Sequence, residues 1–123
     1  MGANPNGRQF AIAAANTLQL DKLNAAGIGN SVTTVTSTSA YVIVAVTYDA
    51  RVVTFYVNGV FAGAATSAQT FGDGTVNQLG AYGSGNTLDA DVAAFFGSSN
   101  VLSAQDLERL TKFWSSKYNV VLG

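Results

Sequence analysis

Apolar and polar positions alternate with a period of two along most of the chain, and this is the period of β-strands. The pattern predicts strands over residues 9–15, 18–20, 32–38, 41–48, 52–57, 60–63, 76–82 and 91–96. The glycine-containing segment 25–30 interrupts the pattern, whereas the nearly continuous apolar run 41–48 is typical of a central strand covered on both faces. Of the two rings at Phe95-Phe96, one is expected to cover the core.

The sharpest local signal is the dipeptide Asn58-Gly59, which stands between two apolar runs. A two-residue turn of type I′ needs positive φ at both central residues, and Asn and Gly tolerate that conformation best. The sequence therefore predicts a tight β-hairpin here.

The period changes to that of a helix after residue 101. Ser103 stands in an N-cap position, with Asp106 three residues later in the position of a capping box. One apolar stripe follows at spacings of three, four and four, through Leu107, Leu110, Trp114 and Tyr118. We expect one helix over about 103–117. The helix and the short strands together predict a single domain, 1–123. This domain is expected to be mostly β, as an antiparallel β-sandwich or jelly roll with one C-terminal helix.

Composition removes several classes of function. The 123 residues include no Cys and no His, so thiolate zinc sites and catalysis by an imidazole base are excluded. Six cations against seven acids give a net charge of -1, which argues against a nucleic-acid surface. The longest apolar stretch, 41–46, is too short to insert across a membrane. A surface rich in uncharged polar residues favours an extracellular or virion protein.

Several segments in order resemble laminin-G-like, concanavalin A-like domains. The resemblance runs from about Gly7 to Val120, and it is carried by the segments VAVTYD (44–49), TFYVNGV (54–60), LGAY (79–82), LDADVA (88–93), LSA (102–104) and WSSKY (114–118). It implies a concanavalin A-like β-sandwich. Domains of this kind recur in phage tail fibres, other virion appendages and secreted bacterial adhesins.

The resemblance implies a non-enzymatic attachment module on the virion surface or outside the cell. Its expected partners are sister subunits, other virion proteins and a host surface carbohydrate. Alternatives are a purely structural virion decoration protein without a glycan site, and a secreted bacterial adhesin domain. Family domains have further strands before the position matching Gly7, so the expected alternatives are a fragment of a longer domain, a pared-down fold, or a sandwich whose missing strands a neighbouring chain supplies. An uncovered sheet edge would favour a homo-oligomer, with a homotrimer as the hypothesis.

The segment 82–89 supplies an aromatic ring beside amide and carboxylate groups, as carbohydrate sites do. Tyr82, Asn86 and Asp89 are therefore the candidate ligand-binding residues. The competing interpretation is a plain hairpin loop in which Tyr82 packs at the end of a strand.

Acidic residues give two further hypotheses. Asp89 and Asp91 would share one face of a strand, but Glu108 is the only glutamate and lies on the predicted helix, so the two-carboxylate machinery of a glycosidase is missing. We expect no enzyme activity and no cofactor. The alternative role for Asp89 and Asp91 is as calcium ligands, with Asp49 and Asp73 as further oxygen donors.

Overall fold

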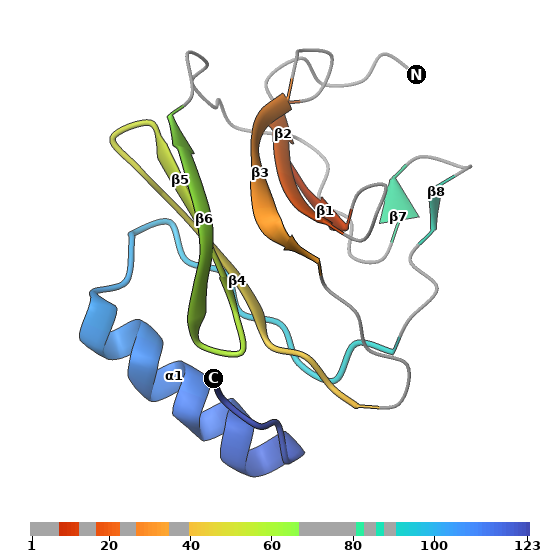
Figure 1. Cartoon of the computed structure of the whole chain (residues 1–123), viewed down its shortest axis with the longest axis vertical. Helices are drawn as coiled ribbons and strands as arrows, with labels where there is room; N and C mark the ends of the chain where they lie inside the picture. The colour runs from red at the N-terminus through yellow and green to blue at the C-terminus, as the bar shows by residue number, and fades with distance from the viewer. Residues whose placement is uncertain are drawn as a thin grey trace.

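The described strands form antiparallel sheets, and one helix follows them (Figure 1). The computed structural model describes residues 8–12, 17–22, 27–34, 40–66, 81–82, 86–87 and 91–123, with the side chains of 40–66 and 91–123. The first sheet holds β1 (Arg8–Ile12), β2 (Thr17–Lys22) and β3 (Gly27–Thr34); the second holds β4 (Val44–Asp49), β5 (Val52–Val57) and β6 (Val60–Thr66); β7 (Ala81–Tyr82) pairs with β8 (Asn86–Thr87); and α1 spans Ala104–Tyr118. Strand β3 lies against β5 and β6, so the first two sheets meet there. The expected mostly-β, antiparallel fold with one C-terminal helix is confirmed.

The hairpin between β5 and β6 has the predicted turn. Asn58 and Gly59 have φ values of 49° and 81°, as a type I′ turn requires. The turn between β4 and β5 also takes two residues with positive φ, Ala50 and Arg51, although neither is a residue that favours this conformation. The two tight turns hold β4, β5 and β6 in one continuous antiparallel ladder.

The core lies on one face of this second sheet. Val53 and Phe55 of β5 have no exposed surface, and Ala62 of β6 is almost fully buried. The register places Val46 of β4 opposite Phe55, and other β4 side chains pack on the same cluster. Among the described strands β5 is central and β4 lies at the edge of its sheet, which differs from the central strand predicted over 41–48. Residues 41–43 precede β4, and within the described ranges β4 pairs with β5 alone.

Two other strand predictions also need correction. Strand β3 covers Gly27–Thr34 and includes glycines that were expected to interrupt the pattern. The ladder between β2 and β3 shifts register near these residues, where Leu20 pairs with Gly29 and Asp21 with Gly27, and glycine accommodates such a bulge.

Residues 91–96 form no strand, and all of them are exposed. Phe95 and Phe96 expose 71% and 48% of their surface, so neither ring covers the core as expected. The apolar pattern gave the segment the character of a strand, but no described strand pairs with it.

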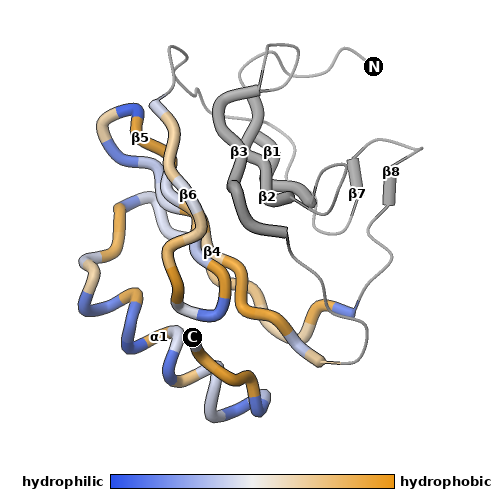
Figure 2. The backbone as a smooth tube through the Cα atoms, viewed as in Figure 1, coloured by the Kyte–Doolittle hydropathy of each residue, from blue (hydrophilic) through white to orange (hydrophobic). Residues whose placement is uncertain are grey.

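Helix α1 begins where its cap predicts. The hydroxyl of Ser103 accepts a hydrogen bond from the Asp106 backbone N–H (3.1 Å) and donates one to the Asp106 carboxylate (2.7 Å). The observed bounds are one residue later at each end than the expected 103–117. The stripe from Leu107 to Tyr118 is half-buried, and hydrophilic and apolar positions alternate along the helix (Figure 2).

The end of the chain ties α1 to the sheet. Asn119 caps the helix in the left-handed conformation, and Val120 after it is buried. The Gly123 N–H donates to the Asn58 carbonyl (3.2 Å), while the Asn58 side chain accepts from the Ile43 N–H (2.9 Å). Asn58 thus connects the hairpin tip, the start of β4 and the C-terminal tail, and this arrangement fixes α1 over the sheet. Within the described part of the chain, no helix is long and apolar enough to cross a bilayer.

Candidate functional site

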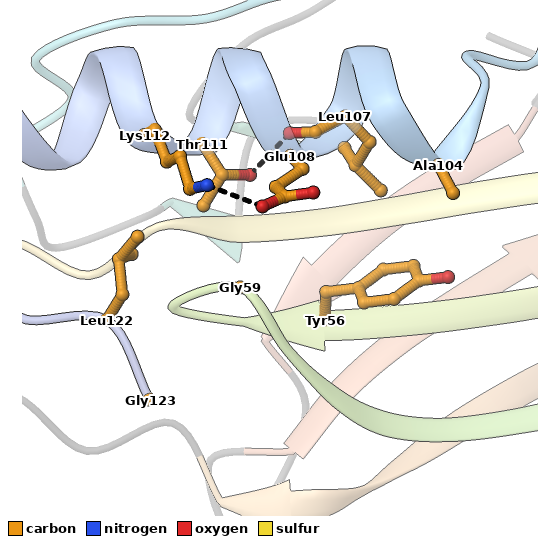
Figure 3. A pocket seen from close by; sticks show the side chains of 9 residues that line it. All are labelled: Tyr56, Gly59, Ala104, Leu107, Glu108, Thr111, Lys112, Leu122 and Gly123. Carbon is orange, nitrogen blue, oxygen red and sulfur yellow. Dashed lines mark hydrogen bonds and ion pairs between the residues drawn. The ribbon is translucent and has the colours of Figure 1, made fainter.

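A groove lies between α1 and the face of the second sheet that is turned away from the core. It consists of two adjoining cavities of about 270 and 340 Å³, both lined by Tyr56, Ala104 and Leu107. We call it the helix–sheet groove. The first cavity, shown in Figure 3, is also lined by Gly59, Glu108, Thr111, Lys112, Leu122 and Gly123; the second is also lined by Thr47, Asp49, Ala50, Val52, Thr54, Val101 and Leu102.

The floor of the groove follows from the alternation of side chains along a strand. Val53 and Phe55 point into the core, so Thr54 and Tyr56 point to the opposite face. The register places Thr47 directly opposite Thr54, and the small residue Ala45 opposite Tyr56. The Thr47 and Thr54 hydroxyls and the Tyr56 ring therefore share one face of the sheet.

The wall of the groove comes from the first turns of α1. Ala104, Leu107 and Thr111 fall on one helix face at spacings of three and four. Ala104 and Leu107 approach the sheet above Tyr56, and Thr111 approaches the hairpin tip at Gly59 (Figure 3). Thr111 is buried, and its hydroxyl donates to the Leu107 carbonyl (2.7 Å) rather than into the groove. The hydrogen-bonding hydroxyls of the floor are therefore those of Thr47, Thr54 and Tyr56.

Glu108 and Lys112 form the charged rim of the first cavity. Their side chains are 2.5 Å apart and both are mostly exposed. The hydrogen bond from Lys112, followed by its positive charge, lowers the pKa of the Glu108 carboxyl below 4.5, against a small opposing effect of desolvation. Glu108 therefore stays ionised and paired at neutral pH.

The hairpin tip borders the first cavity of the groove. A Cβ added to Gly59 would lie 3.3 Å from the Thr111 methyl group and 3.8 Å from a methyl group of Leu122 in the tail. The helix and the turn thus approach each other at a position that only glycine fits without strain. Asp49, the last residue of β4, is exposed and lines the second cavity.

These features define the chemistry that the groove can perform. One aromatic ring, paired hydroxyls and carboxylates at the rim suit a neutral, hydroxyl-rich ligand with an apolar face. Two cavities of this size together match the space that a small ligand occupies.

Two of the predicted ligand-binding residues lie on the short strands β7 and β8. Tyr82 and Asn86 are paired across β7 and β8, so the backbone brings these two candidates opposite each other. Their side chains, and Asp89 entirely, lie outside the described residues. Their roles as ligand-binding residues therefore remain predictions.

The candidate calcium ligands are only partly described. Asp91 is exposed, and Asp49 lies at the rim of the helix–sheet groove, while Asp73 and Asp89 are outside the described residues. Within the described ranges, no group of three or more acidic side chains could hold a metal ion.

Sequence reasoning missed the helix–sheet groove. The signal was present in β5, where Thr54 and Tyr56 alternate with Val53 and Phe55. The position of α1 could not be predicted, because the apolar stripe of an amphipathic helix does not indicate which face of a sheet the helix packs on. The groove exists only once that face is known.

Comparison with known proteins gives one match. No curated protein and no solved structure matches the chain. The family model described as concanavalin A-like lectin/glucanases superfamily matches residues 1–108, which covers the described strands and the start of α1. The match ends earlier than the resemblance found in the sequence, which continued to Val120. The chain belongs to the concanavalin A-like lectin/glucanase superfamily.

Proposed function

We propose that the protein is a non-enzymatic attachment module that binds a surface carbohydrate in the helix–sheet groove. The observation that carries this proposal is the floor of the groove, where the Thr47–Thr54 pair lies beside Tyr56. Aromatic rings pack on the C–H faces of sugars, and short hydroxyl side chains exchange hydrogen bonds with sugar hydroxyls. Membership in a superfamily of lectins and glucanases supports the same ligand class.

A binding role fits the groove better than catalysis. Glycoside hydrolysis needs one carboxyl that stays protonated and a second carboxylate beside it. Glu108 lies on the rim with a lowered pKa and an ion-pair partner, which is the opposite of a general acid. We propose that no hydrolysis accompanies binding.

The wider setting that we propose is an appendage on a virion, of the tail-fibre kind, that assembles with sister subunits, with a homotrimer as the working hypothesis. A secreted bacterial adhesin would use the same groove in another setting. A purely structural decoration role is the second candidate. It is favoured by exposed phenylalanines, since Phe61 and Phe95 expose 60% and 71% of their surface.

The test is a glycan array probed with the wild-type protein, followed by titration of the strongest ligand. Thr54→Val keeps the size and β-branching of the side chain but removes a hydroxyl from the floor. We expect it to weaken binding about two- to tenfold, the usual value of one neutral hydrogen bond. Thr66→Val is the matched control, because Thr66 is an exposed β6 threonine that does not line the groove.

The Tyr82→Ala variant separates the two candidate sites. If binding is lost in Tyr82→Ala and retained in Thr54→Val, the carbohydrate binds at the β7–β8 hairpin and the helix–sheet groove is the wrong site. If the wild-type protein binds no glycan on the array, the decoration role replaces the proposal.

A further inference from the structure

The two cavities of the helix–sheet groove differ in chemistry. The second cavity holds hydroxyl and carboxylate groups, because Thr47, Asp49 and Thr54 line it and do not line the first. The Tyr56 hydroxyl is directed away from Gly59 and toward the side of Ala104, as Figure 3 shows. The hydroxyls of a sugar therefore find hydrogen-bonding partners at this end of the groove.

The first cavity has an apolar end beside the hairpin tip. Methyl groups of Thr111 and Leu122 lie 3.3 and 3.8 Å from the point where a Cβ on Gly59 would stand. The Thr111 hydroxyl donates to the Leu107 carbonyl (2.7 Å), so Thr111 offers its methyl group rather than its hydroxyl to a ligand. Such surroundings favour a methyl group, because a hydroxyl buried among them would lose its hydrogen bonds to water.

One hydrogen-bond acceptor and one donor lie beside this apolar end. The Glu108 carboxylate and the Lys112 ammonium both line the first cavity, side by side between α1 and the hairpin (Figure 3). Their ion pair leaves capacity for a ligand, since a carboxylate has two acceptor oxygens and an ammonium has three N–H donors. The two charges cancel, so this wall favours a neutral polar group.

We propose that the helix–sheet groove selects sugars that carry an acetamido group, and that this group occupies the first cavity. The inference rests on the proposed function, because it names the class of sugar that the groove binds. An acetamido group has one N–H, one carbonyl and one methyl group. The N–H donates to Glu108, the carbonyl accepts from Lys112, and the methyl group packs between Thr111 and Leu122. The sugar ring then lies on Tyr56, with its hydroxyls toward the second cavity.

Related substituents match only part of this arrangement. The methyl group of a 6-deoxy sugar fits the apolar end but has no partner for Glu108 or Lys112. A free amino sugar lacks the methyl group, and a carboxylated sugar places a second negative charge beside Glu108. One buried methyl group changes affinity about fourfold, and one hydrogen bond to a charged group changes it about tenfold or more.

Paired glycans on an array, followed by titration, test the substituent. Each pair differs only in an acetamido or a hydroxyl group: N-acetylglucosamine with glucose, N-acetylgalactosamine with galactose, and N-acetylmannosamine with mannose. We expect the acetamido member of the best-bound pair to bind at least tenfold more tightly than the hydroxyl member. It should also bind more tightly than the free amino sugar and 6-deoxygalactose.

The outcomes separate this inference from the proposed function. Equal binding within the pairs, or tighter binding of the free amino sugar or of 6-deoxygalactose, overturns the inference while carbohydrate binding stands. A protein that binds no glycan at all overturns both.

Variants on α1 and on the floor test where the acetamido group lies. Lys112→Met removes the ammonium but keeps a long side chain, so the preference for acetamido over hydroxyl should fall about three- to tenfold. Lys117→Met is the matched control that should leave the preference unchanged, because Lys117 is exposed on the same helix and lines neither cavity. Thr54→Val should weaken both members of a pair equally, since Thr54 lines the second cavity alone. A preference that Lys112→Met leaves intact, or that Thr54→Val changes, overturns the inference.

Discussion

Strand β5 and the segment Asp91–Gly97 have similar composition and opposite surroundings. Both are short and apolar, and both contain phenylalanine, but Phe55 has no exposed surface while Phe95 exposes 71%. Strand β5 has a hydrogen-bonded neighbour on each side, whereas Asp91–Gly97 has none among the described strands. The difference shows that an apolar pattern buries its side chains only where neighbouring strands also satisfy its backbone.

Replacing one phenylalanine in each region gives the largest expected effect. Phe55→Ala removes a fully buried ring from the core of the second sheet, and we expect a loss of about 3–5 kcal/mol in the free energy of unfolding. Phe95→Ala, measured on dilute protein, should change it by less than about 0.5 kcal/mol because the ring is exposed. Urea denaturation measures both values.

A large loss of stability in Phe95→Ala would contradict this contrast, and it would mean that the ring is buried in the monomer in solution.

Glycines in the two regions offer a second matched pair with a smaller effect. Gly59 has a φ of 81°, and an added Cβ would lie 3.3 Å from Thr111, so Gly59→Ala should cost about 1–2 kcal/mol. Gly97 lacks a positive φ, and an added Cβ would meet only the Phe95 ring at an ordinary 3.5 Å. Gly97→Ala should be neutral or stabilising by about 0.4–1 kcal/mol. If both variants lose the same free energy of unfolding, the close approach of Gly59 to Thr111 does not contribute to holding α1 in place.

The sequence predicted those parts of the fold that depend on neighbouring residues. The turn at Asn58-Gly59 and the cap at Ser103 each need only a few adjacent side chains, and both are confirmed. Strand order depends on residues far apart in the chain, and there the prediction differs from the structure. The apolar run before Asp49 suggested a central strand, but among the described strands β5 is the central one, because tight turns on both sides give it two neighbours.

The candidate site was harder to predict for the same reason. Tyr82 and Asn86 were chosen because they are close in the sequence, and the structure pairs their backbones. Tyr56 drew no attention as a site residue, because its role depends on α1, which begins almost fifty residues later. A site between a sheet and a helix needs tertiary structure before it can be seen.

The smallest expected effect concerns the exposed ion pair between Glu108 and Lys112 on α1. Lys112 lowers the pKa of Glu108 below 4.5, so the folded state holds the ionised carboxylate more firmly than the unfolded state does. The stabilisation is fully present above pH 4.5 and is lost as the pH falls through the lowered pKa of Glu108.

Glu108→Gln, which has a similar helix propensity, should therefore melt at a slightly lower temperature than the wild type at neutral pH and at the same temperature in acid. Thermal melts on both sides of pH 4.5 measure this, and added salt should shrink the difference at neutral pH because the pair is exposed. A difference that persists in acid would show that Glu108 stabilises α1 through its packing at the rim of the helix–sheet groove rather than through its charge.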